Sequence, residues 1–193
     1  ARYVVETIQS ALNTGLARND IAILYRSNAQ SRVLEEALLR ERIPYRIYGG
    51  QRFFERAEIK NAMAYMRLLE GRGNDAALER VINVPARGIG EKTVEAIREH
   101  ARHSDVSMWE AMRQLIANKA LPGRASGAIA GFVELIESLA AKVMEMPLHL
   151  MTQTVIEQSG LIAYHQAEKG EKGQARVENL EELVSAARNF ENT

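Results

Sequence analysis

The sequence predicts a mainly α-helical protein, in which a short N-terminal α/β piece (residues 1–50) precedes an all-helical domain (residues 51–193). Three observations favour this fold class. Apolar residues recur at helical spacing along most of the chain, two short runs before residue 50 are typical of strands, and no convincing strand pattern follows. The length of 193 residues suggests one or two domains with a real core.

The first fifty residues alternate between helical and extended patterns. Residues 3–16 and 31–43 carry apolar side chains at helical spacing. Residues 21–25 form a short apolar run with polar flanks, and residues 44–50 begin with a proline, alternate in polarity and end in two glycines. This order of helix, strand, helix and strand indicates a fragment of an α/β domain with parallel strands, a partial sheet.

The remaining residues indicate successive helices. Residues 56–71 form a strongly amphipathic pattern, and Ser107 with Glu110 three positions later is typical of a capping box. Residues 168–174, EKGEKGQ, combine two glycines with four charges and predict a mobile exposed loop. The further helical patterns cover residues 75–83, 91–103, 107–119, 128–146, 150–160 and 175–191.

Composition limits the classes of function. The formal net charge is +0, so a strongly basic nucleic-acid binder is not indicated, although a local basic patch is enough to contact phosphates. The absence of cysteine excludes disulfides and thiolate metal sites and fits a reducing cytoplasm, where we expect the protein to act. No apolar run is long enough for a transmembrane helix, so we expect no membrane partner. Because the chain has no initiator methionine, we expect a piece of a longer protein.

The segment RVINVPARGIGEKT, residues 80–93, is first tested as a nucleotide loop. A P-loop needs a lysine directly after its second glycine, but here Glu91 separates Gly90 from Lys92 and would repel a nucleotide phosphate. A dinucleotide fingerprint also fails, because Thr93 occupies the third glycine position. The sequence therefore argues against nucleotide binding at this segment.

The same segment fits a helix-hairpin-helix motif, which grips DNA phosphates without reading the sequence. Gly88 and Gly90 permit a tight turn, and Ile89 can anchor that turn in the core. A helix that begins after the turn directs its free N–H groups and its dipole at a phosphate, where Lys92 and Thr93 add donors. A plain helical corner without a ligand explains these residues equally well. The candidate DNA contacts here are Arg87, Gly88, Ile89, Gly90, Lys92 and Thr93.

A second candidate segment is LYRSNAQSR, which follows the first predicted strand. Functional loops lie at the carboxyl ends of parallel strands, and Arg26 and Asn28 offer donors suited to a phosphate backbone. The alternative is a polar turn in which Asn28 or Ser31 caps the next helix. Further along the chain, Phe53 and Phe54 are suited to stacking on bases, but core packing is the favoured interpretation.

Five stretches, in order and over nearly the whole chain, resemble the UvrD/Rep/PcrA group of superfamily 1 DNA helicases. They are IAILYRSNAQSRVLEEALL, IPYRIYGGQRFFERAEIKNAMAYMRLL, VINVPARGIGEKT, MPLHLMTQTVIEQSGL and EKGQARVENLEELV. The resemblance implies that residues 1–50 are part of the second RecA-like motor domain (2A), and that residues 51–193 are most of its helical insertion (2B). It also implies that the parent protein is an ATP-dependent 3′-5′ DNA helicase acting in DNA repair.

The resemblance further implies roles for the candidate residues. Arg26 and Asn28 would contact the single strand, and residues 88–93 would contact duplex phosphates, while 2B regulates unwinding. The alternative is a protein-interaction module that docks repair proteins or a second helicase copy. The family places the groups that bind ATP and Mg²⁺ before residue 1 or after Thr193. We therefore expect these residues to contain no catalytic group, no metal site and no cofactor, since no metal or hydrolase motif occurs either.

Overall fold

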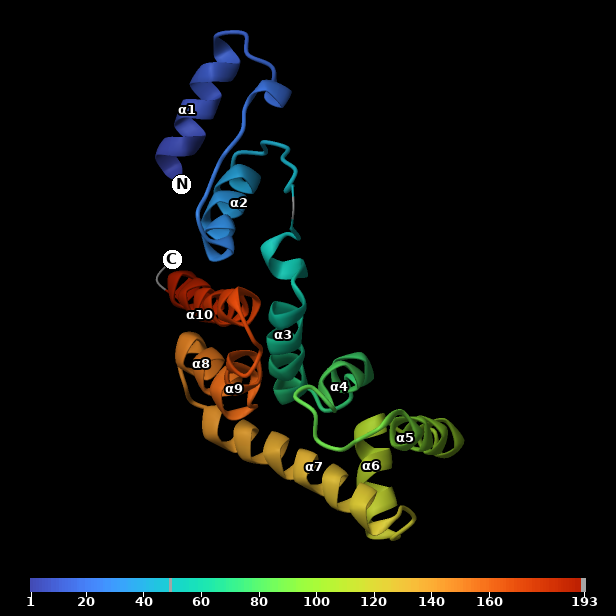
Figure 1. Ribbon diagram of the computed structural model, residues 1–193. Helices are drawn as coiled ribbons and strands as arrows, with labels where there is room; N and C mark the ends of the chain where they lie inside the picture. The colour runs from blue at the N-terminus through green and yellow to red at the C-terminus, as the bar shows by residue number, and fades with distance from the viewer. Residues whose placement is uncertain (49, 192–193) are drawn as a thin grey trace. The chain divides into compact units, whose positions relative to one another are not determined.

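The fold is mainly α-helical, as predicted. Figure 1 shows the computed structural model, which describes residues 1–48 and 50–191. The chain divides into two compact units, Ala1–Arg56 and Ala57–Thr193, and each is described by itself. The domain assignment to residues 1–50 and 51–193 stays a prediction.

The first unit has a small core between two helices. Val5, Ile8 and Leu38 are buried there, and the partly buried side chains of Ile23 and Tyr45 are among those that pack against them. A core of this size contributes little to stability, because the free energy gained from burial is proportional to the apolar area removed from water. The helices are α1 (Arg2–Asn13) and α2 (Ser31–Arg40), and the 3-10 turns are η1 (Arg18–Asp20), η2 (Asn28–Gln30) and η3 (Phe53–Glu55).

The prediction of two strands in the first unit is corrected by the structure. Residues 21–25 and 44–48 are irregular connections, although their side chains alternate: Ile23 packs on the small core and Leu24 is 94% exposed. Within the described residues, no backbone hydrogen bond joins the two segments, and a strand exists only where its N–H and C=O groups pair with a neighbour. The alternation of apolar residues therefore predicted which side chains face the core, but it did not show that the backbone lacks a neighbouring strand. Gly49, predicted to end the second strand, lies outside the described residues.

The second unit is built of helices around one core. Figure 1 shows α7 running along this unit, with α8 to α10 near one end and α6 near the other. Large buried side chains come from several helices, among them Tyr65, Leu68, Ile97, Met112 and Phe132. The helices are α3 (Ala57–Glu70), α4 (Asp75–Val81), α5 (Glu91–Ser104), α6 (Met108–Ala117), α7 (Gly123–Val143), α8 (Leu148–Gln158), α9 (Leu161–Gln166) and α10 (Glu171–Glu191).

Local chemistry explains where two of these helices begin. The Ser107 hydroxyl accepts the backbone N–H of Glu110 at 3.2 Å, so the predicted cap of α6 is confirmed. Asn74 caps α4 in the same way, because its side-chain oxygen accepts the N–H of Ala77 at 3.0 Å. Among the described helices, none combines the length and apolarity needed to cross a membrane.

The predicted loop at residues 168–174 is also corrected. α10 already begins at Glu171, so most of this segment is helical. Gly173 explains the difference, because an ideal Cβ there would lie 2.5 Å from the carbonyl oxygen of His165 and 2.7 Å from that of Glu168. The glycine therefore serves close packing of α10 on the end of α9, and a flexible loop is not needed to explain it.

Candidate nucleic-acid interface

The hairpin, residues 82–90, joins α4 to α5 and is organised from within by Asn83. The Asn83 side-chain oxygen accepts the backbone N–H of Arg87 at 2.7 Å and that of Ile89 at 3.3 Å. Gly88 has a φ of +76°, a left-handed conformation that glycine adopts without a steric penalty. Ile89 is only 1% exposed and anchors the turn in the core. The hairpin is therefore a fixed structure with its apolar residue buried.

The first turn of α5 presents free backbone donors beside the hairpin. Gly90 is the N-cap residue, and its carbonyl accepts the N–H of Thr93 at 3.0 Å and that of Val94 at 3.1 Å. The N–H groups of Gly90, Glu91 and Lys92 have no acceptor within the described chain, as is usual for the start of a helix. Among the described residues, and apart from the two chain neighbours of Gly90, no atom lies within 4 Å of an ideal Cβ at this position. This end of α5 is therefore open to an anion, which the helix dipole favours.

The charged side chains at this turn oppose each other. Lys92 and Glu91 are both exposed, and Thr93 is partly exposed. Lys92 favours a phosphate at this position, whereas the Glu91 carboxylate disfavours one. The turn therefore suits weak contact with a phosphate backbone better than tight binding of a single small anion.

Arg87 lies at the base of the hairpin, and its side chain is directed inward. Its guanidinium donates to the carbonyl oxygens of Val81 at 3.3 Å and Pro85 at 3.0 Å. It also donates to the carbonyl oxygen of Ser159, at the end of α8, at 2.8 Å. The sequence grouped Arg87 with the phosphate contacts, but its donors satisfy backbone carbonyls of the protein.

Tyr65 of α3 supports the same corner from below. Its hydroxyl donates to the carbonyl oxygen of Val84 at 2.6 Å, and the Arg87 guanidinium lies 5.7 Å from the centre of its ring. Burial raises the pKa of Tyr65 to about 12, although the nearby charge of Arg87 lowers it in part. The tyrosine is therefore a neutral hydrogen-bond donor to the hairpin.

The second candidate segment, residues 26–30, is a single 3-10 turn that leads into α2. The Gln30 side chain accepts the backbone N–H of Arg26 at 3.0 Å and that of Ser27 at 3.3 Å. Ser27 in turn accepts the N–H of Ala29 at 3.3 Å and caps the 3-10 turn η2. The N-cap residue of α2 is Gln30, without a side-chain cap, so the predicted capping of this helix by Asn28 or Ser31 is wrong. The residues predicted to contact DNA, Arg26 and Asn28, are both exposed.

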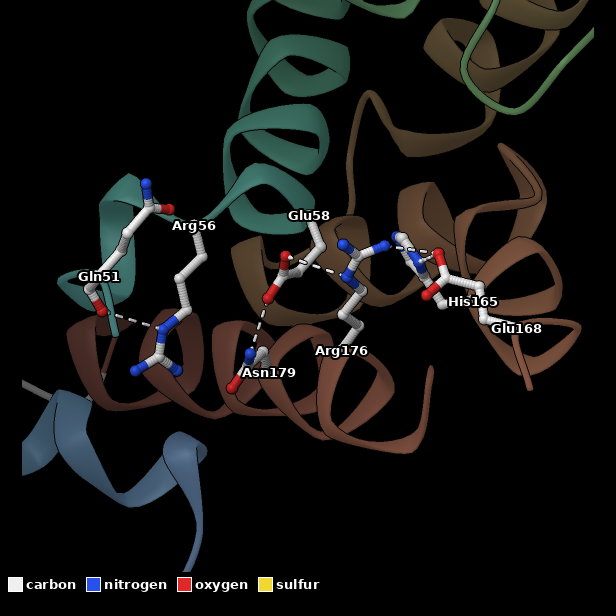
Figure 2. A network of polar contacts seen from close by, with 7 residues as sticks. All are labelled: Gln51, Arg56, Glu58, His165, Glu168, Arg176 and Asn179. Atoms are coloured by element: carbon white, nitrogen blue, oxygen red, sulfur yellow. Dashed lines mark hydrogen bonds and ion pairs between the residues drawn. The ribbon is translucent and has the colours of Figure 1, made fainter. Parts of the chain in front are cut away.

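Arg56 holds this turn from behind. Its guanidinium donates to the carbonyl oxygen of Asn28 and to the hydroxyl of Ser31, each at 2.8 Å. It also donates to the carbonyl oxygen of Gln51 at 3.3 Å (Figure 2). Phe53 lies beside it and is fully buried, whereas Phe54 is 49% exposed, so core packing describes only the first of the two aromatics.

A buried polar network in the second unit was not found from the sequence. Figure 2 shows Glu58 of α3 facing Asn179 and Arg176 of α10, with the Asn179 amide donating at 2.7 Å. Arg176 also contacts Glu168 at 2.5 Å, and Glu168 lies 3.0 Å from the Nδ1 atom of His165. Burial raises the pKa of the Glu168 carboxyl, but the contacts with His165 and Arg176 outweigh burial and leave the pKa lowered.

The comparisons with known proteins give the class of the chain. The sequence pattern of the UvrD-like helicase C-terminal domain family matches residues 1–193. The chain therefore belongs to this family, and the resemblance drawn from its motifs is confirmed.

Individual relatives are similar over almost the whole chain. DNA helicase II of Escherichia coli (strain K12) is 55% identical over 190 residues, which cover 98% of this chain and 26% of that protein. DNA helicase II of Haemophilus influenzae is 53% identical over the same shares of the two chains. The ATP-dependent DNA helicase PcrA of Staphylococcus epidermidis is 35% identical over 191 residues, or 99% of this chain and 26% of that protein. The chain thus spans about a quarter of the length of these curated relatives.

Proposed function

We propose that the chain is part of an ATP-dependent 3′-5′ DNA helicase that acts in DNA repair, and that its hairpin contacts the phosphates of duplex DNA. The observation that carries this proposal is the open first turn of α5. There the free N–H groups of Gly90, Glu91 and Lys92 lie next to a hairpin that is fixed by buried residues. The family membership supports DNA as the partner.

The chemistry of the turn favours contact that is independent of base sequence. Backbone N–H groups and a lysine reach phosphate oxygens, which are the same at every base pair, whereas specificity needs side chains at base edges. One lysine beside one glutamate gives a weak attraction, and the formal net charge of +0 adds no general attraction. The contact would therefore help to orient the duplex and regulate unwinding, and other parts of the protein would supply most of the affinity.

Residues 26–30 are proposed to contact the single strand. Arg26 and Asn28 are exposed on a turn whose backbone is fixed by Gln30 and Arg56. Such a turn presents a charge and an amide to successive phosphates at a low cost in conformational entropy, because its backbone is already ordered. We place this contact in the first unit and the duplex contact in the second.

ATP and Mg²⁺ belong to the proposed activity of the whole protein. The residues present do not fit a nucleotide, because Glu91 separates the Gly90 N-cap from Lys92 and no Gly-Lys-Ser/Thr run occurs in the sequence. We therefore assign no step of ATP hydrolysis to these residues. The 193-residue chain alone is expected to show no ATP turnover above background.

A second candidate function is self-association or the docking of a repair protein. Exposed apolar side chains favour it, since Met144 after α7 is 80% exposed and Phe190 of α10 is 76% exposed. Sedimentation of the chain with and without nuclease separates the two functions. Association that survives digestion supports a protein interface, whereas association bridged by DNA is lost.

The duplex proposal is tested by a charge placed at the N-cap of α5. Gly90→Asp adds a carboxylate in open space, and aspartate is a good N-cap residue, so the helix is not weakened. Gly123→Asp is the matched control, because Gly123 is exposed at the start of α7 and its Cβ position is also open.

Fluorescence anisotropy with a labelled duplex, at several salt concentrations, gives the affinity of each variant. We expect Gly90→Asp to weaken binding by about tenfold or more, because the carboxylate repels the phosphate and competes for the free N–H groups. Gly123→Asp should bind as the parent chain does. Equal affinity of Gly90→Asp and the parent chain would overturn the proposal.

A further inference from the structure

Arg87 makes contacts of an unusual kind for a residue beside a phosphate site. Its guanidinium donates to carbonyl oxygens on both sides of the hairpin base, at Val81 and Pro85, and to Ser159, which is 72 positions away in the sequence. The same group lies over two aromatic rings, with 5.7 Å to the centre of Tyr65 and 5.6 Å to that of Phe132. Its positive charge therefore interacts with carbonyl oxygens and aromatic rings of the protein.

We propose that Arg87 is a positioning residue of the DNA-binding hairpin, which it ties to the α8–α9 turn, and that it is not itself a phosphate ligand. This inference rests on the proposed function of the hairpin. If the guanidinium turned outward to DNA, it would give up three carbonyl oxygens. Val81 would keep the N–H of Val84 and the hydroxyl of Tyr65, but the carbonyl oxygens of Pro85 and Ser159 would need a new donor.

The α8–α9 turn is shaped to receive the hairpin. Gly160 has a φ of +84°, and an ideal Cβ there would lie 3.5 Å from the Cγ atom of Pro85. Ser159 precedes it and offers the carbonyl that Arg87 reaches at 2.8 Å. A side chain at this position would touch Pro85, so the turn lies close to the hairpin, and one charge-assisted hydrogen bond joins the two.

Positioning of this kind acts on affinity through preorganisation. The free N–H groups of α5 and the outer face of the hairpin bind a phosphate only when both are held in one geometry. A hairpin that must be ordered on binding loses part of the contact energy to conformational entropy. By holding the hairpin in place, Arg87 thus strengthens its binding to phosphate without itself contacting the DNA.

The test is the charge-conserving variant Arg87→Lys, compared with Lys92→Gln. A lysine keeps the positive charge and binds phosphate well, but it cannot bridge three carbonyls as the planar fork does. If Arg87 positions the hairpin, Arg87→Lys should weaken duplex binding by about tenfold. In the DNA-free protein, Arg87→Lys should also speed the hydrogen exchange of the Ile89 amide, which donates its N–H to the Asn83 side-chain oxygen.

Lys92→Gln should also weaken duplex binding but for a different reason, since Lys92 is proposed to face the phosphate. Its affinity should fall with a salt slope that is smaller by about one, while the exchange of the Ile89 amide stays unchanged. Arg87→Lys with the affinity and the Ile89 exchange of the parent chain would overturn the inference.

Asn83→Ala and Gly90→Asp distinguish failure of the inference from failure of the proposed function. Asn83→Ala removes the acceptor for two hairpin amides without a change of charge, so it should reproduce the loss of affinity even if Arg87→Lys does not fold. If Asn83→Ala binds like the parent chain, fixation of the hairpin does not matter and the inference fails. If Gly90→Asp also leaves binding unchanged, the proposed function fails, whereas a weakened Gly90→Asp with normal Arg87→Lys removes only the role of Arg87.

Discussion

The two candidate DNA-contacting segments are both held by an arginine, but only one of them is also anchored by an apolar side chain in a core. Each turn has an arginine behind it that donates to backbone carbonyls, Arg87 behind the hairpin and Arg56 behind residues 26–30. The hairpin is anchored by Ile89 in the core of the helical unit. Residues 26–30 have no such anchor, and their backbone is held by the exposed side chain of Gln30.

This difference separates residues that present a turn from residues that contact a ligand. The sequence points to one arginine in each segment as a phosphate ligand, but only one of the two side chains is exposed. Arg26 is exposed, whereas Arg87 is committed to carbonyl oxygens. An arginine next to a glycine turn is therefore a weak indicator of contact until its own partners are known.

The largest expected effect contrasts the apolar residues beside the two segments. Ile89→Ala should lower the free energy of unfolding by about 3 kcal/mol, because it leaves a cavity beneath the hairpin. Leu24→Ala, next to residues 26–30, should change stability by less than about 0.5 kcal/mol, since that side chain is 94% exposed. Urea denaturation of the two variants measures both values. Similar losses would remove the contrast between the segments.

The next effect sharpens the account of the hairpin itself. Gly88→Ala forces an alanine to a φ of +76° and should cost about 1–2 kcal/mol of stability. Gly90→Ala, two positions away, has ordinary backbone angles and open space, so folding should change by less than about 1 kcal/mol. Thermal unfolding compares the pair. A larger loss for Gly90→Ala would contradict the described turn.

A smaller effect concerns acid sensitivity, which should reside in the helical unit. The folded-state pKa of Glu168 is lowered, so its contribution to stability is present above its ordinary pKa and is lost as the pH falls below about 4.5. Glu168→Gln should remove up to about 1 kcal/mol at neutral pH and flatten the decline on the acid side. Denaturation at pH 7 and at pH 3 to 4 tests this, with the exposed Glu181→Gln on α10 as control. A decline as steep as in the parent chain would show that Glu168 is not responsible.

The smallest expected effect is on residues 26–30. Gln30→Ala removes the acceptor for two backbone amides and should cost about 0.5–1 kcal/mol, because the site is exposed. Binding of single-stranded DNA should weaken while duplex binding stays constant. Equal weakening toward both DNA forms would argue against the division of roles between the two segments.

Features set by local sequence could be predicted, and features set by distant partners could not. Helical periodicity placed most of the helices, and Ser107 marked the start of α6. The short α9 was not predicted, and α7 begins at Gly123, before the predicted start at residue 128. The prediction of strands was wrong because strand pairing depends on a neighbouring backbone. The prediction of a loop at residues 168–174 was wrong because Gly173 packs against the end of α9.

The same distinction applies to the candidate site. The glycines, Ile89 and the helix start could be placed from the spacing alone, since each acts within a few residues. The inward direction of Arg87 depends on Ser159, and the buried network joins Glu58 to Asn179 across 121 positions. No local pattern indicates such contacts.

The free N–H groups at the start of α5 are proposed to meet DNA phosphates. Backbone amide NMR of the ¹⁵N-labelled chain, during titration with a short duplex, observes these groups one by one. The largest shifts should occur at Gly88, Gly90, Glu91 and Lys92 and should diminish as salt is added. Shifts confined to other surfaces, with these four amides unchanged at saturation, would contradict the proposed contact.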